Sequence, residues 1–195
     1  MSDDTGQVAK PLRADARRNR EQVLAVAREM LSVDGSSASF DEIARRAGVG
    51  VGTVYRHFPT RNALFEAVVV DRVAEFTERA RTLAADAAPE DPFLGYFAHL
   101  VGEVALNQAL CEALDDGSAA TIDIPDQLRR DFVRSFESLL AQAKRAGVVR
   151  SDVAVADVLD LLIGAAEAER RARSRGIPNH LVRVVLDGLR AQHHR

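Results

Sequence analysis

The chain has 195 residues, of which 47% are apolar and 28% charged, a composition typical of a globular protein that buries its own core. Its single cysteine excludes an intramolecular disulfide scaffold, and no stretch is long and apolar enough for a membrane-spanning helix. The formal net charge of -3 argues against a uniformly basic nucleic-acid-binding surface. The first residues include no apolar segment of the signal-peptide type, so we expect a cytoplasmic protein.

Proline placement and apolar spacing predict an all-α fold. Each of the six prolines lies between segments whose apolar residues have helical spacing. No segment has the strict alternation of a half-buried strand. Residues 1–12 are expected to form a flexible arm. Helices are expected, in chain order, over residues 14–33, 40–47, 51–57, 60–86, 92–115, 126–146, 152–174 and 178–192.

Residues 40–58 fit two short helices joined by a tight turn. Ser39 and Glu42 have the spacing of a capping box at the start of the first helix, and Gly48 supplies the backbone freedom that ends it. This pattern is typical of a helix-turn-helix, whose second helix enters the DNA major groove. The expected outward positions of that helix are Val51, Gly52, Thr53, Tyr55, Arg56 and His57.

The same segment resembles the TetR family of one-component transcriptional regulators. The resemblance rests on Ile43-Ala44, on Ala47-Gly48-Val49 at the turn, on the run 53–58 in the second helix, and on the run 59–64 that opens the long helix. It implies an N-terminal three-helix helix-turn-helix domain over residues 13–60.

The resemblance also implies DNA contacts around the second short helix. Tyr55 and His57 would bind phosphate, and Thr53 and Arg56 would lie at the groove. The full expected set is Ser39, Arg45, Val51, Gly52, Thr53, Tyr55, Arg56, His57 and Arg61. Gly50 and Val51 depart from the family, which commonly has a capping serine and a polar residue there. We therefore expect poor direct base readout at the start of this helix.

Residues 61–195 are expected to form a larger helical domain for effector binding and dimerisation. Aromatic and apolar residues concentrate in the helices expected at 92–115 and 126–146, with a few polar neighbours, as in a small-ligand pocket. An apolar or aromatic effector is therefore expected. The candidate ligand residues are Phe93, Tyr96, Phe97, Leu100, Glu103, Val104, Asn107, Phe132, Phe136 and Leu140.

The last two helices carry apolar residues beyond a single face. A surface helix needs only one apolar stripe, so a second stripe indicates burial against another subunit. TetR-like proteins pair these two helices with their copies, and a homodimer is therefore expected. The candidate interface residues are Val155, Leu159, Leu162, Ile163, Ala166, Leu181, Val185 and Leu189.

The predicted function is a ligand-responsive, sequence-specific DNA-binding transcriptional regulator, a repressor released from a palindromic operator by its effector. Residues 9–61 hold ten Lys or Arg against six Asp or Glu, so the acidic average conceals a basic segment. Two alternatives remain: a non-specific DNA-binding protein, and a small-molecule-binding protein that has lost DNA binding. Enzyme motifs are absent, so no enzyme is expected. No cofactor or metal is expected either, because His99 and Glu103 share a helix face without a third ligand.

Overall fold

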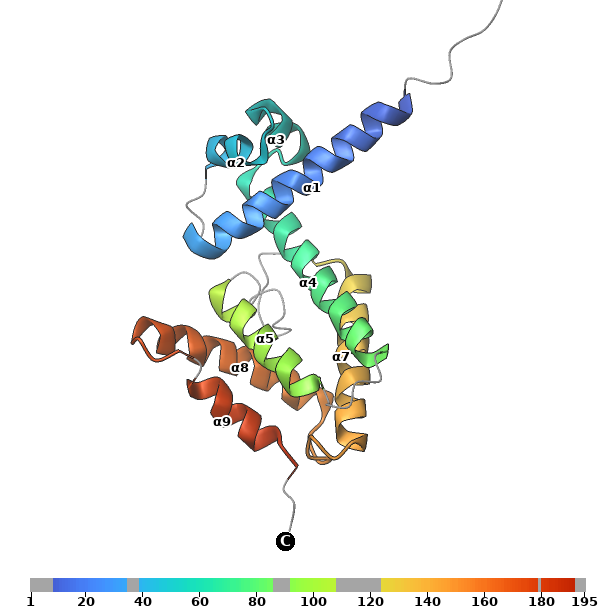
Figure 1. The fold of residues 1–195 in the computed structure, drawn as a ribbon, viewed down its shortest axis with the longest axis vertical. Helices are drawn as coiled ribbons and strands as arrows, with labels where there is room; N and C mark the ends of the chain where they lie inside the picture. Colours follow the sequence, from blue (N-terminus) through green and yellow to red (C-terminus); the bar gives the residue numbers. More distant parts are fainter. Residues whose placement is uncertain (1–8, 35–38, 86–91, 108–123, 179, 192–195) are drawn as a thin grey trace, which may run out of the picture. The chain divides into compact units, whose positions relative to one another are not determined.

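The computed structural model describes residues 9–34, 39–85, 92–107, 124–178 and 180–191. Within these ranges all regular elements are helices, and the prediction of an all-α fold is confirmed (Figure 1). Their bounds are α1 Ala9–Asp34, α2 Phe40–Ala47, α3 Val51–His57, α4 Arg61–Ala85, α5 Phe93–Leu106, α7 Asp126–Arg145, α8 Val155–Ser174 and α9 His180–Leu189. The structure divides into two compact units, residues 1–68 and 69–195, and the division falls inside α4.

The first unit is built around one apolar cluster shared by α1, α2, α3 and the first turns of α4. On each helix the cluster members have helical spacing and form one apolar face. The apolar faces of the four helices pack against one another. The cluster consists of Val23, Leu24, Ala27, Met30, Phe40, Ile43, Ala44, Val54, Phe58, Leu64 and Val68. Val23, Ala27 and Val54 are fully buried, so α3 is fixed against α1 and α2.

Local signals set the ends of α2. The Ser39 hydroxyl accepts a hydrogen bond from the Glu42 backbone N–H at 3.2 Å, as the sequence predicts. The second half of the expected capping box is replaced, because the Glu42 carboxylate accepts from Arg45 and Arg46 instead. Gly48 ends the helix with a left-handed φ of 66°, which an L side chain rarely adopts.

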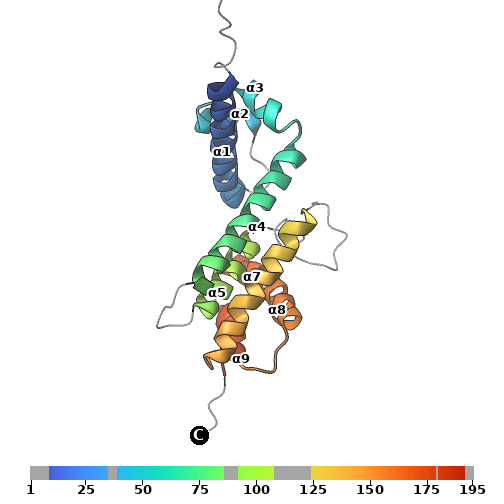
Figure 2. The same cartoon turned by 90° about the vertical axis from the view of Figure 1, so that its right-hand side faces the viewer.

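In the second unit α5 packs on α8, and α8 packs on α9 (Figure 2). α5 is buried along most of its length, and its fully buried residues include Phe93, Phe97 and Leu100. The chain after α8 turns back so that the Arg150 N–H donates to the Leu189 carbonyl at 3.0 Å. This hydrogen bond ties the end of α9 to the segment that follows α7.

Several expected helices differ in extent from the observed ones, and α9 covers only His180–Leu189 of the range expected at 178–192. α1 begins at Ala9, inside the expected arm, and includes Pro11 in its first turn, where proline is tolerated. α5 ends at Leu106, where Asn107 turns to extended backbone. α8 begins at Val155, where the Ala154 N–H donates to the Asp157 carboxylate at 2.8 Å. Residues 108–123, which include the rest of the helix expected at 92–115, lie outside the described ranges.

The described helices give no candidate for crossing a membrane, since none combines the required length with sufficient apolar character. Among the same described residues, no group of three or more His, Cys, Asp or Glu side chains is arranged to hold a metal ion. Cys111 lies outside the described ranges.

Candidate functional site

α3 turns a distinct set of side chains toward solvent. Val54 is fully buried in the apolar cluster, which orients the remainder of the helix. Val51 and Tyr55 are 38% and 54% exposed, and Gly52 and Arg56 are exposed beside them. The accessible face of α3 therefore presents a valine side chain, the bare backbone of Gly52, a phenol and a guanidinium group.

The position of Tyr55 is fixed by an aromatic contact. Its ring meets the ring of Phe40, the first residue of α2, edge to face with centroids 4.8 Å apart. One end of Tyr55 is thus held by α2, while the hydroxyl end remains in solvent. A hydroxyl held in this way can donate a hydrogen bond to an external acceptor such as a phosphate oxygen.

The other residues expected to bind DNA lie around α3 with differing exposure. Ser39 and Arg61 are exposed, at the start of α2 and at the first position of α4. Thr53 is half-buried. The Ser39 hydroxyl accepts a hydrogen bond within the chain and can still donate its own proton.

His57 is more enclosed than the sequence suggests. Its Nε2 atom is buried and has no hydrogen-bond partner among the described residues. Burial, and then the positive charges of Arg56 and Arg20, lower the pKa of His57 below its usual value. The imidazole is therefore neutral at neutral pH.

Sequence reasoning missed the main interaction of Glu42, which was expected only as a capping partner. Its carboxylate accepts hydrogen bonds from Arg45 at 2.6 and 2.8 Å and from Arg46 at 2.8 Å. These guanidinium groups lower the pKa of Glu42 to about 2. Glu42 thus offsets one of the two positive charges of Arg45 and Arg46, and it would compete with a phosphate for these guanidinium groups.

We expect the Glu42→Gln variant to bind DNA more tightly. Freed guanidinium groups would contact phosphate, raising affinity about tenfold at low salt and steepening the log–log salt slope by about 0.9 per added contact. Asp41→Asn is the matched control, because it changes the charge equally while Asp41 is exposed in the same turn. Fluorescence anisotropy at several salt concentrations measures both. Equal gains for the two variants would assign the effect to net charge instead.

Most of the residues expected to bind the effector are buried, and the aromatic ones among them contact one another. Phe93 and Phe136 meet edge to face at 5.5 Å, and Tyr96 and Phe132 lie at 6.3 and 6.1 Å from Phe136. Eight of the ten expected ligand residues are buried: Phe93, Tyr96, Phe97, Leu100, Val104, Phe132, Phe136 and Leu140. In this structure they pack against one another, as core residues do.

The two polar members of the expected ligand set have different surroundings. Glu103 forms an ion pair with Arg72 of α4, and Arg72 also donates to Glu75 at 2.8 Å. The Glu103 carboxylate is thus directed at α4. Asn107, at the end of α5, is half-buried.

We expect the Tyr96→Phe variant to be less stable by about 1 kcal/mol, because the buried hydroxyl donates to the Phe76 carbonyl at 2.8 Å. Burial also raises the pKa of Tyr96. A group whose pKa is raised on folding contributes stability below its unfolded pKa, and that stability is lost at higher pH. Chemical unfolding should therefore show wild type losing more stability than the variant above about pH 10. Parallel losses would contradict this role.

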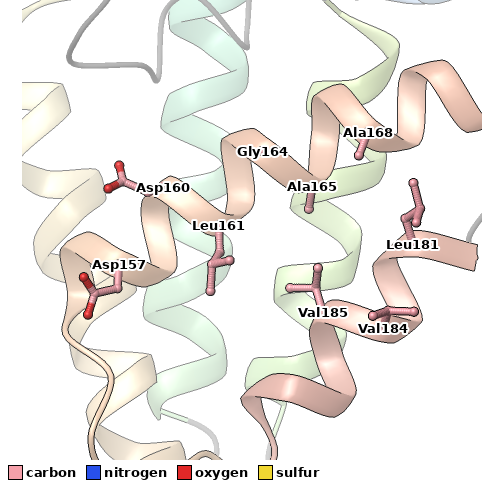
Figure 3. Close-up of a pocket in the computed structure, with 9 residues that line it drawn as sticks. All are labelled: Asp157, Asp160, Leu161, Gly164, Ala165, Ala168, Leu181, Val184 and Val185. Carbon is pink, nitrogen blue, oxygen red and sulfur yellow. The ribbon is translucent and has the colours of Figure 1, made fainter.

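The outer face of α8 and α9 carries an apolar groove (Figure 3). Figure 3 shows Leu161, Ala165 and Val185 between the two helices, with Asp157 and Asp160 at one end. The full lining is Asp157, Asp160, Leu161, Gly164, Ala165, Ala168, Leu181, Val184 and Val185. Leu161 and Val184 are 41% and 58% exposed, so this face of the subunit is left apolar and uncovered.

The residues expected at a subunit interface fall into two groups that differ in burial. Leu162, Ala166 and Leu189 are each 1% exposed, since they face the inside of the subunit, and they have almost no surface left for a partner. The other expected residues are half-buried: Val155, Leu159, Ile163, Leu181 and Val185. Leu161, Gly164, Ala168 and Val184 share the outer face and were not expected there. Leu161, Gly164 and Ala168 lie three and four residues apart on one face of α8, but apolar residues surround this helix, so the spacing does not show which face is the outer one.

Two family models match the chain. The model described as "Bacterial regulatory proteins, tetR family" matches residues 23–68, and the model described as "Transcriptional regulator SbtR-like, C-terminal domain" matches residues 88–191. The second match alone covers more than half of the chain. The chain therefore belongs to the TetR family of bacterial transcriptional regulators.

Individual relatives agree with this assignment. A TetR transcription regulatory protein from Mycobacterium vanbaalenii is 41% identical with a TM-score of 0.69, over 92% of this chain and 99% of that chain. The TetR transcriptional regulator SCO0520 from Streptomyces coelicolor is 32% identical with a TM-score of 0.69, over 89% and 99%. HTH-type transcriptional regulator SAR0097 from Staphylococcus aureus is 36% identical over 63 residues, 31% of this chain and 33% of that protein. This chain thus spans about a third of that relative.

Proposed function

We propose that the protein is a homodimeric, ligand-responsive transcriptional regulator that binds a near-palindromic operator and represses transcription until an effector releases it. The observation that carries the proposal is the accessible face of α3, with Val51, Gly52, Tyr55 and Arg56 exposed on a helix fixed by buried Val54. A recognition helix presents such a face to the major groove. The proposed role is regulatory and cytoplasmic, without catalysis.

The proposed DNA contacts divide by chemistry. Tyr55, Ser39, His57 and Arg61 offer hydroxyl, imidazole and guanidinium donors suited to phosphate oxygens. Arg56 and Thr53 of α3 would contact base edges in the major groove. Arg45 contributes to phosphate binding to the extent that it leaves Glu42. Phosphate contacts would fix the register of α3, and the groove contacts would select the sequence.

The proposed dimer pairs the outer faces of α8 and α9 across a two-fold axis. Support comes from an uncovered apolar face with small residues at Gly164 and Ala168, which allow helices to approach closely, beside exposed Leu161 and Val184. A two-fold axis places the same patch on both subunits. The two α3 helices would then meet half-sites one DNA turn apart, about 34–36 Å.

The proposed effector is small and apolar or aromatic, and it binds among the aromatic residues of α5 and α7. Because those side chains are packed together, the effector would bind a second state in which this core opens. Residues 13–60 would form the DNA-binding domain and residues 61–195 the effector and dimer domain, with α4 continuous between them. A coupling of about 1–3 kcal/mol would change operator affinity by about 5–150-fold.

A protein that binds DNA without sequence preference is the second candidate. The observation that favours it is the start of α3, where Gly50, Val51 and Gly52 offer no polar side chain for base readout. Its affinity would come from phosphate contacts alone and would be strongly reduced by salt.

Selection from fragmented genomic DNA with the purified protein tests the proposal. We expect enrichment of fragments that share a near-palindrome whose half-sites lie one helical turn apart. Enrichment with no shared motif would instead favour the non-specific candidate. Recovery at background level would favour a protein that has lost DNA binding. Transcription of a reporter behind the enriched fragment then distinguishes repression from activation.

A further inference from the structure

We propose that α3 reads a thymine in each operator half-site through the methyl groups of Val51. The inference rests on the proposed sequence-specific DNA binding and names one base contact within it. Its basis is the combination of an exposed valine and two flanking glycines at the leading end of α3.

Val51 is the first residue of α3 and is 38% exposed. It lies outside the apolar cluster of the first unit, whose α3 member is Val54. The β-branched side chain of Val51 is also not favoured in a helix. Packing and helix propensity therefore do not explain valine at this position, whereas the N-terminal residues of a recognition helix are those that contact base edges.

The glycines beside Val51 are not required by the protein's own geometry. Gly50 has an ordinary φ of -70°, and a Cβ added at Gly50 or Gly52 would meet no other atom within 4 Å. Gly50 also forgoes a side-chain hydrogen bond at the start of the helix, and glycine within a helix, such as Gly52, is destabilising relative to alanine. What the two glycines provide is bare backbone on both sides of Val51, which lets that valine approach an external surface closely.

The major groove offers one apolar group that matches such a side chain. Thymine presents its C5-methyl group there, while the other base edges present hydrogen-bond donors and acceptors. Val51 has no donor or acceptor in its side chain, so a polar edge opposite it would lose its water without replacement. An A·T pair that places its thymine methyl group against Val51 avoids this loss of hydration.

Deoxyuridine tests this contact, because it differs from thymine only by the missing methyl group. Each thymine of the selected operator is replaced in turn, in both half-sites, and binding is measured by fluorescence anisotropy with wild type, Val51→Ala and Thr53→Ser. The serine variant is the matched control, since Thr53 is the nearest other α3 residue with a methyl group and Ser keeps its hydroxyl. Circular dichroism verifies that the variants remain folded.

At one thymine position we expect deoxyuridine in a single half-site to lower wild-type affinity about fourfold, which is the effect of one buried methyl group. Deoxyuridine in both half-sites should lower it about fifteenfold. Thr53→Ser should keep this sensitivity and Val51→Ala should lose it. Wild-type indifference to deoxyuridine at every position overturns the inference, as does equal sensitivity in Val51→Ala or a half-site without an A·T pair. If the wild-type protein still binds the operator tightly in these cases, the proposed function is not contradicted. Failure to select any operator would instead reject that function itself.

Discussion

Replacing Tyr55 with Phe is expected to lower operator affinity by about a hundredfold or more without changing thermal stability. A hydrogen bond to a charged group contributes about 1.5–3 kcal/mol, and a dimer would lose one in each half-site. The ring contact with Phe40, at 4.8 Å, does not involve the hydroxyl and is retained in Phe. Fluorescence anisotropy with the selected operator, together with calorimetry, measures both effects.

Tyr96→Phe is the internal control for this experiment, because the same atom is removed from a buried tyrosine of the second unit. The two variants should show opposite patterns: Tyr55→Phe loses DNA affinity and keeps stability, while Tyr96→Phe loses stability and binds operator normally at a temperature where it is folded. An operator affinity of Tyr55→Phe equal to that of wild type would remove Tyr55 from the phosphate contacts.

Placing arginines at Leu161 and Val184 together is expected to convert the proposed dimer to a monomer. Both residues are exposed on the outer face of α8 and α9, so the subunit itself can accommodate the change. Across a two-fold axis, however, the variant would bring four bulky guanidinium groups into a largely apolar interface, where the loss of their hydration is strongly unfavourable. Joint binding of two half-sites would then be lost, lowering operator affinity by about 10²–10⁴-fold. Sedimentation velocity gives the mass.

Leu106→Arg is the matched control for the interface variant. Leu106 is a large apolar residue, 47% exposed, at the end of α5, and it does not line the groove. The same change there should leave the dimer and its operator affinity intact. Monomers from both variants would indicate general destabilisation, and a dimer that survives arginines at both Leu161 and Val184 would contradict the proposed interface.

The first unit could be predicted closely because its signals are local. The Ser39 cap, the left-handed Gly48 and the buried residues of α2 and α3 all lie within about twenty residues of one another. Each of these signals can be recognised from residue type and spacing alone, so α2 and α3 begin and end where expected. The partner of Glu42 was not predicted, because a carboxylate three or four residues from two arginines can bond either of them or the helix cap.

The second unit was predicted in outline only, because its sites depend on contacts between distant segments. Phe93 and Phe97 on α5, and Phe136 on α7, belong to apolar stripes that look the same in sequence whether they line a cavity or fill a core. Only their packing partners distinguish a cavity from a core. α8 raised a related difficulty. Its apolar residues surround the helix, so sequence could not show that Leu162 faces inward while Leu161 faces solvent.

Competition between the selected operator and a scrambled duplex of the same composition tests the proposed sequence-specific regulation most directly. Anisotropy is measured with wild-type protein from about 50 to 200 mM salt, a range in which phosphate contacts weaken markedly. Specific recognition predicts that affinity for both duplexes falls with salt while the operator keeps an advantage of about a thousandfold or more. Equal affinities for the two duplexes throughout the range would contradict it.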